Sequence, residues 1–295
     1  MVVSDGERRI ALVVADSIGF ARRLLGPDRD FTAEFREQAR RLTGLPPEAS
    51  MLCATHAHST PETLGFRPLR EYPGALAWLE TLRDRFASAV ALADRAREPA
   101  RLKRASVRAE GVAHCHRIIA KDGSIHHYSQ RPPDTEIASW GVTDPELVVL
   151  LLERPEGRPA IVLTHFACHP VTVQVQPLVS ADFPGVIAAL VPQTPPGCEH
   201  CLFLQGAAGS INPVRDTSDF ADVARYGLTL AGAMLQLLGR MAAPDYPTET
   251  NRVGFAQTTV SLPSCPIPPP APLEEAVRQA HDWLLSVEGA PGERL

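Results

Sequence analysis

The stretch LVVLLLERPEGRPAIVLTHFACHP, residues 147–170, decides how the main sheet of this chain is built. Its two apolar runs, residues 147–152 and 160–166, flank a Pro-Glu-Gly sequence that is typical of a turn. The two runs are therefore predicted to pair as a hairpin. Pro170 then ends the second strand, because proline has no backbone N–H to donate to a neighbour.

Strands and helices alternate along the rest of the chain. Further strands are predicted at residues 9–15, 50–55, 101–113, 201–205 and 251–262. Helices are predicted at residues 31–42, 76–96, 183–191, 219–238 and 273–287. Interleaved elements with at least one hairpin favour an α/β fold, with a mixed β-sheet core and helices packed on it, over a purely parallel sheet.

The composition excludes several classes of protein. The 295 residues are 44% hydrophobic, which suits one large domain or two small ones. A net charge of -5 gives no electrostatic reason to expect a nucleic-acid partner. No apolar run reaches the roughly 18 residues of a transmembrane helix, and the polar segment from Met1 to Arg9 does not look like a signal peptide. A cytoplasmic location is the default expectation.

The six cysteines are expected to be free thiols, most of them buried, because most stand alone inside apolar runs. Cys198 and Cys201 form a C-x-x-C pair, but no second pair at zinc-binding spacing accompanies it. A redox pair would be expected at the start of a helix. We therefore interpret the pair as two incidental thiols in a surface loop.

Two histidine motifs follow apolar runs. In THAHSTP, residues 55–61, His56 and His58 are two apart, so on a strand both imidazoles point to one side and form half a zinc site. In HFACHPVT, residues 165–172, His169 is favoured over His165 because it lies at the exit of the strand. The alternatives are two unrelated loop histidines and a hydrogen-bonded core histidine. If both motifs are functional, a metal site lies at the strand ends.

A run of small residues, LQGAAGSINP at 204–213, follows another predicted strand. It lacks the Lys-Ser/Thr ending of a P-loop and does not match the dinucleotide-binding fingerprint. Small residues allow backbone N–H groups to approach a ligand closely, so an anion or oxyanion cradle is one interpretation. A tight turn that serves only packing is the other.

Six segments follow one another along the chain: Asp16 after the first predicted strand, THAHSTP (55–61), HCHR (114–117), FACHPVT (166–172), SADFPG (180–185) and LQGAAGSINP (204–213). In this order they resemble the N-terminal catalytic domain of the neutral, non-lysosomal ceramidase family. The resemblance runs from about Arg9 to Pro213 and more loosely to Leu262. It implies a ceramidase-like domain at residues 1–262 that lacks its first strand, followed at 263–295 by a proline-rich linker and the start of a helical segment.

Members of this family are zinc amidases that cleave the N-acyl bond of ceramide-like lipids, a reaction of sphingolipid metabolism. The resemblance implies that His56 and His169 are zinc ligands and that His58 lies beside the metal, facing the substrate or the attacking water. Arg117, in the HCHR segment, matches a basic residue that would hold a polar group of the substrate.

The small-residue loop would border the metal, with Gly209 and Ser210 near the substrate and Asn212 helping to bind the developing oxyanion. It also departs from the family, because Asn212 replaces an essential serine and Ser210 replaces an aspartate. An asparagine donates hydrogen bonds but is no nucleophile. Asp182 is expected near the site, but not on the metal.

The family's remaining zinc ligands, a Glu and a Tyr, are expected beyond residue 295, so the chain is expected to be partial and poorly active on its own. Two alternatives stay open. One is a zinc hydrolase of another amide or an ester, and the other is a non-catalytic remnant of the same fold.

Overall fold

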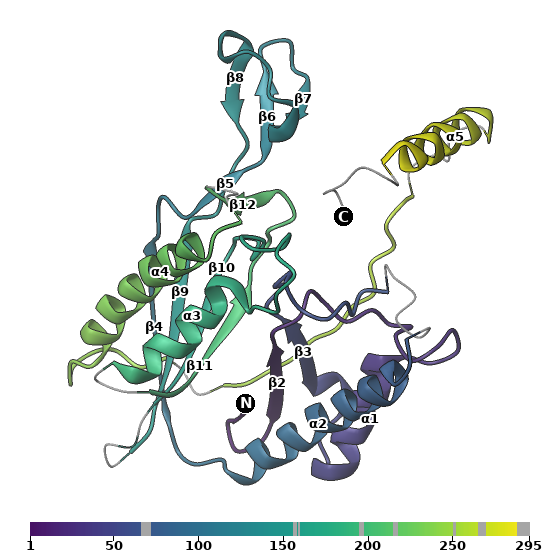
Figure 1. The fold of residues 1–295 in the computed structure, drawn as a ribbon. Coiled ribbons are helices and arrows are strands. Elements are labelled where there is room, and N and C mark those ends of the chain that lie inside the picture. The colour runs from purple at the N-terminus through teal and green to yellow at the C-terminus, as the bar shows by residue number, and fades with distance from the viewer. Residues whose placement is uncertain are drawn as a thin grey trace. The chain divides into compact units, whose positions relative to one another are not determined.

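The computed structural model describes residues 1–65, 72–155, 158, 160–194, 198–214, 218–249, 252–264 and 270–287. These residues belong to two compact units, Met1–Ala256 and Gln257–Leu295. All residues of the candidate site belong to the first unit. Its strands and helices form two sheet-and-helix layers and a small projecting sheet (Figure 1).

A mixed four-stranded sheet, in the order β11-β10-β9-β4, forms the larger layer. The strands are β4 (Arg101–Arg108), β9 (Glu146–Glu153), β10 (Ala160–Phe166) and β11 (Cys198–Gln205). β9 and β10 pair antiparallel, with Leu152 opposite Ile161, which confirms the predicted hairpin. β10 and β11 pair parallel, so the predicted mixed sheet is confirmed as well.

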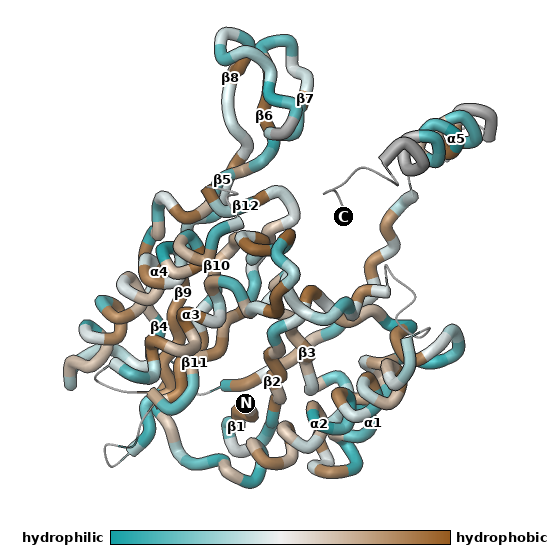
Figure 2. Tube along the Cα trace, viewed as in Figure 1, coloured by the Kyte–Doolittle hydropathy of each residue, from teal (hydrophilic) through white to brown (hydrophobic). Residues whose placement is uncertain are grey.

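Two helices cover this sheet, α3 (Asp182–Leu190) and α4 (Phe220–Met241). Figure 2 shows the hydrophobic residues concentrated on β9 and its neighbouring strands. The core between helices and sheet includes the fully buried side chains of Phe166, Phe183, Tyr226, Leu230 and Met234. Apolar burial on this scale is the main stabilising term of the layer.

The second layer is a three-stranded sheet, β1-β2-β3, with two helices packed on it. Its elements are β1 (Val2–Ser4), β2 (Arg9–Ala15), α1 (Phe31–Thr43), β3 (Ser50–Ala54) and α2 (Ala75–Arg95). β2 and β3 pair parallel, and α1 lies between them in sequence. Asp30 caps α1 by accepting the N–H of Ala33, and Gly44 ends it at a φ of 72°.

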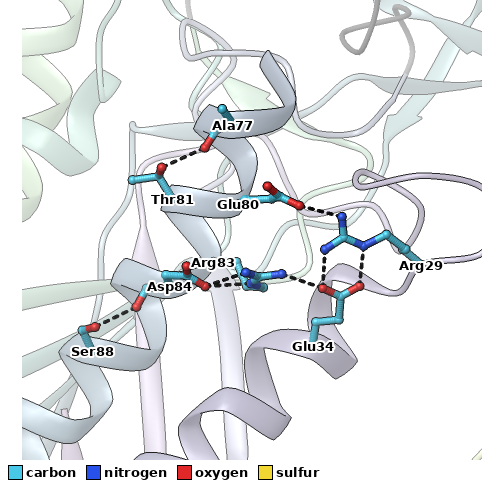
Figure 3. Close-up of polar contacts among 8 residues, drawn as sticks. All are labelled: Arg29, Glu34, Ala77, Glu80, Thr81, Arg83, Asp84 and Ser88. Carbon is cyan, nitrogen blue, oxygen red and sulfur yellow. Dashed lines mark hydrogen bonds and ion pairs between the residues drawn. The ribbon is translucent and has the colours of Figure 1, made fainter. Parts of the chain in front are cut away.

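An ion-pair network joins α1 to α2 (Figure 3). Arg29 forms two hydrogen bonds with Glu34, of 2.6 and 2.8 Å, and a third of 2.7 Å with Glu80. Arg83 of α2 donates to the same Glu34 carboxylate at 2.6 Å. Partly exposed ion pairs contribute little singly, about 0–1 kcal/mol, so this network adds to the apolar packing between the two helices.

The remaining strands are short. β12 (Ile211–Pro213) pairs antiparallel with β5 (Ala113–Cys115). β6 (Arg117–Ala120) lies between β7 (Ile125–His127) and β8 (Ile137–Trp140) in the small sheet that projects at the top of Figure 1. The part of the chain that the structure describes also contains short 3-10 turns at Pro47–Ala49, Tyr128–Gln130, Asp134–Glu136 and Val191–Gln193.

The predicted strand at 251–262 is wrong over the residues that the structure describes, 252–262, where no strand forms. Phe255, Val260 and Leu262 are exposed there, so the apolar alternation has no core to face. In the second unit, α5 (Pro270–Val287) covers the last predicted helix. None of the helices that the structure describes is long and apolar enough to cross a lipid bilayer.

The interpretation of Cys198 and Cys201 as loop residues is also wrong. Both lie in β11 and are buried, which raises the pKa of Cys198 to about 11 and that of Cys201 to about 12. They face inward although they are three apart, because the register shifts between Ala160 and Ile161 and Glu199 becomes an extra residue. Burial of the thiols agrees with the expectation for most cysteines; Cys265 lies outside the described residues.

We predict that Gly227→Ala destabilises the protein. Gly227 of α4 faces Val186 of α3, and an added methyl group would overlap the Val186 side chain. Overpacking of this kind costs about 1–3 kcal/mol in the free energy of unfolding, measurable by urea titration. The matched control is Gly232→Ala in the same helix, where nothing lies within 4 Å and the higher helix propensity of alanine stabilises. Equal effects of the two substitutions would contradict this packing.

Candidate metal centre

His56 follows β3 and is held by the chain that leaves β2. Its backbone N–H donates to the Ser17 carbonyl at 2.9 Å, and its Nδ1 is hydrogen-bonded to the Ile18 carbonyl. Its φ of 68° lies in the left-handed region, so the strand has already ended here. His56 and His58 do lie on one side, but through this bend and not through the strand alternation that the sequence predicted.

His169 follows β10 and is held by the chain that leaves β11. Its backbone N–H donates to the Ile211 carbonyl at 3.0 Å, and its Nδ1 is hydrogen-bonded to the Ala208 carbonyl at 2.7 Å. The two histidines are therefore positioned in the same way. Each follows a strand, and a backbone carbonyl located after the adjacent parallel strand accepts a hydrogen bond from its ring. Parallel pairing makes this design work, because both strands of a pair end at the same edge.

Three imidazoles converge at this edge. The Nε2 atoms of His56 and His169 are 2.8 Å apart, and His58 joins them with one ligand atom so that all three ligand atoms lie within 4.8 Å of one another. The ring centroids are 4.5 to 5.1 Å apart. The backbone N–H of His58 donates to the Pro170 carbonyl at 3.1 Å, which joins the two histidine segments directly.

The hydrogen bonds of the rings fix their tautomers. A neutral imidazole carries one N–H, and in His56 and His169 it is placed on Nδ1 by a carbonyl, which can only accept. Both Nε2 atoms therefore present lone pairs to each other at 2.8 Å. A cation between them removes this repulsion, and two nitrogens bound to one zinc at a tetrahedral angle lie roughly 3.3 Å apart. The ring of His58 supplies a third ligand atom, and its buried Nε2 has no hydrogen-bond partner among the described residues.

Two of the three rings, those of His58 and His169, are poised as neutral ligands. Burial, followed by the proximity of His169 and His56, lowers the pKa of His58 to about 4. Burial, followed by the proximity of His56, also lowers the pKa of His169. Neutral imidazole is the form that binds a metal, so the group fits a divalent cation at neutral pH.

The small-residue loop borders this group, since its Ala208 and Ile211 carbonyls hold His169. Gly206 is the glycine that packing requires, because a Cβ there would lie 2.9 Å from Ala167 and the His165 ring. Gly209 instead faces open space, with nothing within 4 Å of an added Cβ.

The other predicted residues lie along the same loop and the strand next to it. The Ser210 carbonyl accepts the N–H of His116 at 2.9 Å, and Asn212 of β12 lies opposite His114 of β5. Arg117 has an exposed side chain, and its charge contributes to lowering the pKa of His116.

Asp182 lies outside the group of histidines. It is buried with a φ of 54°, and it accepts hydrogen bonds from the Thr172 hydroxyl at 2.8 Å and from the Phe183 N–H at 2.7 Å. Burial raises its pKa. The carboxyl therefore braces the segment that follows His169.

The sequence reasoning overlooked a second cluster of rings beside the loop. His116 lies 4.7 Å from the ring of His127 and 6.3 Å from that of Tyr128, and His114 lies 5.9 Å from Tyr128 and 6.1 Å from Trp140. The sequence signal for this cluster is the density of histidines in HCHR, residues 114–117, and in His126-His127.

We predict that the metal-free protein loses stability between about pH 6.5 and pH 4. His58 has a pKa of about 4 in the folded state against 6.5 for the free side chain, so the unfolded state binds a proton in this window that the folded state does not. Stability therefore falls as the pH falls. Urea titrations in chelator at pH 7 and pH 4.5 measure the loss, and His58→Gln should reduce it. An unchanged pH dependence in that variant would show that His58 is not desolvated.

Comparison with known proteins gives a fold. No protein-family profile matches the chain, and no curated protein matches its sequence. Among solved structures, a ceramidase complexed with C2 matches with a TM-score of 0.57 and 19% identity over 80% of this chain and 36% of that one. A neutral ceramidase from Pseudomonas aeruginosa matches with a TM-score of 0.56 and 18% identity over 81% of this chain and 38% of that one. The chain thus spans little more than a third of these proteins, and over that part it has the ceramidase fold that the sequence motifs predicted.

Proposed function

We propose that this chain carries part of a zinc-dependent amidohydrolase that cleaves an N-acyl bond of a ceramide-like lipid. The observation that carries the proposal is the pair of imidazole Nε2 lone pairs held 2.8 Å apart, with a ligand atom of His58 within 4.8 Å of both. The fold supports it, because the structural neighbours are described as ceramidases.

His56 and His169 would hold the zinc ion through Nε2. When bound, zinc supplies Lewis acidity, which polarises a carbonyl and lowers the pKa of water to roughly 7. His58 takes one of two roles, a third ligand or a neighbour that contacts the substrate. The two roles are separable, since loss of a ligand lowers zinc affinity whereas loss of a substrate contact lowers turnover alone.

The chain's own residues would shape the rest of the reaction. The amide of Asn212 offers N–H groups for the oxyanion that develops at the attacked carbonyl, where one donor is worth about 10²–10³ in kcat. The open space at Gly209 leaves room for substrate beside Ser210. Arg117 is exposed and free to contact a polar group of the substrate.

A lipid chain is favoured by the segment that follows His169. Three aliphatic side chains in this short segment are largely exposed: Val175 (72%), Leu178 (58%) and Val179 (80%). Such a concentration differs from the singly scattered apolar residues of an ordinary protein surface. The Ser180 N–H donates to the Ser59 carbonyl at 2.7 Å, so this segment is tied to the residue after His58. Aliphatic side chains next to a hydrolytic metal centre would bind the acyl chain of a lipid substrate.

Because Asn212 replaces the serine of the family, a second function stays open: a zinc hydrolase of a different amide or an ester. The two differ in substrate preference. A panel of N-acyl amides and matched acyl esters, each with short and long acyl chains, separates them, and a rate that rises with chain length only among the amides supports the lipid amidase.

We predict that zinc binding and hydrolysis depend together on the two anchored histidines. His56→Ala and His169→Ala should each lower zinc affinity by more than the roughly 10- to 100-fold that loss of an outer-shell partner costs, and should abolish amide hydrolysis. Zinc content by elemental analysis and turnover of an N-acyl amide are the measurements. His200→Ala, at a histidine 65% exposed on β11, is the control and should change neither.

Activity that survives in both alanine variants, or after complete removal of metal, would exclude this centre. A purified chain that binds no zinc would favour the non-catalytic remnant over the enzyme.

A further inference from the structure

The ring of His56 is held by a segment that belongs to no helix or strand. The N–H of His56 donates to the Ser17 carbonyl at 2.9 Å, and its Nδ1–H donates to the Ile18 carbonyl at 2.5 Å. The structure describes residues 16–20 fully and shows only bends and irregular chain there. Because a peptide group is planar and turns as a unit, the Ile18 carbonyl stays on the ring only while the Ile18–Gly19 peptide keeps its orientation. Something outside the segment must therefore fix that peptide.

Thr63 contacts this segment through both its side chain and its backbone. Its hydroxyl donates to the Gly19 carbonyl and lies 2.5 Å from the Ser17 hydroxyl, and its own carbonyl accepts the N–H of Ala21 at 2.9 Å. A hydroxyl has one proton, so Thr63, which gives its proton to the Gly19 carbonyl, accepts that of Ser17. The two hydroxyls thus bridge Ser17 and Gly19, the residues on either side of Ile18.

Burial makes this bridge difficult to replace. Ser17 is 5% exposed and Thr63 is 1% exposed, so water does not compete for the Gly19 carbonyl. The Ser17 hydroxyl lies 3.4 Å from the same carbonyl, which is too long for it to take over from Thr63 unless the segment moves. The two segments are also packed closely, because an added Cβ at Gly19 would lie 2.5 Å from the Leu64 side chain.

The segment that carries Thr63 is anchored independently of His56. The Ser59 carbonyl accepts the N–H of Ser180 at 2.7 Å, and the Thr60 hydroxyl donates to the Ala57 carbonyl at 2.9 Å. Thr63 therefore lies on a segment with its own hydrogen bonds, from which it can hold the more weakly supported residues 17–19 in place.

We infer that the Thr63 hydroxyl is a positioning group for the metal centre. By fixing the Gly19 carbonyl it holds the neighbouring Ile18 carbonyl on the Nδ1–H of His56, which keeps the Nε2 of His56 turned toward the cation. The inference rests on the metal binding that belongs to the proposed function, and it does not depend on hydrolysis. A hydroxyl that merely satisfied a buried carbonyl would contribute to stability alone.

A pair of substitutions at one position tests the hydroxyl. Thr63→Val keeps the shape of the side chain and removes the hydroxyl, so the zinc Kd should rise by about 10-fold, the lower end of the range for an outer-shell partner. Thr63→Ser keeps the hydroxyl and should bind zinc within about twofold of the unmodified chain. Zinc Kd values come from calorimetric titration of the full chain in competition with a chelator. Equal zinc Kd values for the two variants would overturn the inference.

Thr164→Val is the matched control for stability. Thr164 of β10 is also 1% exposed, and its hydroxyl donates to the Val148 carbonyl at 3.1 Å within the sheet. Urea titration of the metal-free variants should show that Thr164→Val and Thr63→Val both lower the midpoint, whereas only Thr63→Val weakens zinc binding. An equal loss of zinc affinity in Thr164→Val would assign the effect to stability and overturn the inference.

Ser17→Ala provides the decision if Thr63→Val does not fold. It removes the donor to Thr63 but leaves the Gly19 carbonyl paired, so it is the milder change, and the zinc Kd should rise by about fivefold. An unchanged Kd in Ser17→Ala would overturn the inference in that case.

Zinc affinity is measured without turnover, so failure of this inference and failure of the proposed hydrolysis can be told apart. Weaker zinc binding by Thr63→Val, in a chain that hydrolyses no amide, supports the inference and rejects the amidase. Zinc-dependent hydrolysis with an unchanged zinc Kd in Thr63→Val overturns the inference and leaves the amidase in place. A chain that binds no zinc overturns both.

Discussion

The hydrogen bonds from two imidazole Nδ1 atoms to backbone carbonyls govern the rest of this site. Because the Nδ1–H of His56 donates to the Ile18 carbonyl and that of His169 donates to the Ala208 carbonyl, both Nε2 atoms are left with free lone pairs. Held 2.8 Å apart by separate segments, these atoms repel each other unless a cation or a shared proton lies between them. Burial makes the shared proton costly, because it disfavours the charged imidazolium.

The fold supplies those carbonyls through two parallel strand pairs. β2 and β3 are joined through α1, and β10 and β11 are joined through α3, so each pair ends at a single edge. In each pair one strand leads to a histidine and the other leads to the carbonyl that orients it. The antiparallel strands β4 and β9 complete the larger sheet and its core but contribute no group to the site. The parallel part of a mixed sheet thus carries the chemistry, and the antiparallel part carries much of the packing.

Much of this arrangement could be predicted from the sequence, and the failures have physical causes. Apolar runs and turn residues located most strands and helices, and His56 and His169 stood out because each follows an apolar run. The convergence of His56 and His58 was predicted for the wrong reason, because a positive φ at His56 cannot be read from a residue type that usually avoids it. The bulge that buries Cys198 and Cys201 depends on the register with β10, which single-strand patterns do not contain. The same holds for Gly206, whose importance lies in what it touches across the chain.

Zinc K-edge X-ray absorption on the metal-loaded protein tests the central claim most directly. The account predicts one zinc ion per chain, with imidazole nitrogens at about 2.0–2.1 Å, at least two of them, and no sulfur scattering. Substitution of His200 should leave this spectrum unchanged, whereas substitution of His169 should remove it. A spectrum with sulfur at about 2.3 Å would place the ion on the cysteines of β11, and protein that takes up no zinc at all would contradict the account outright.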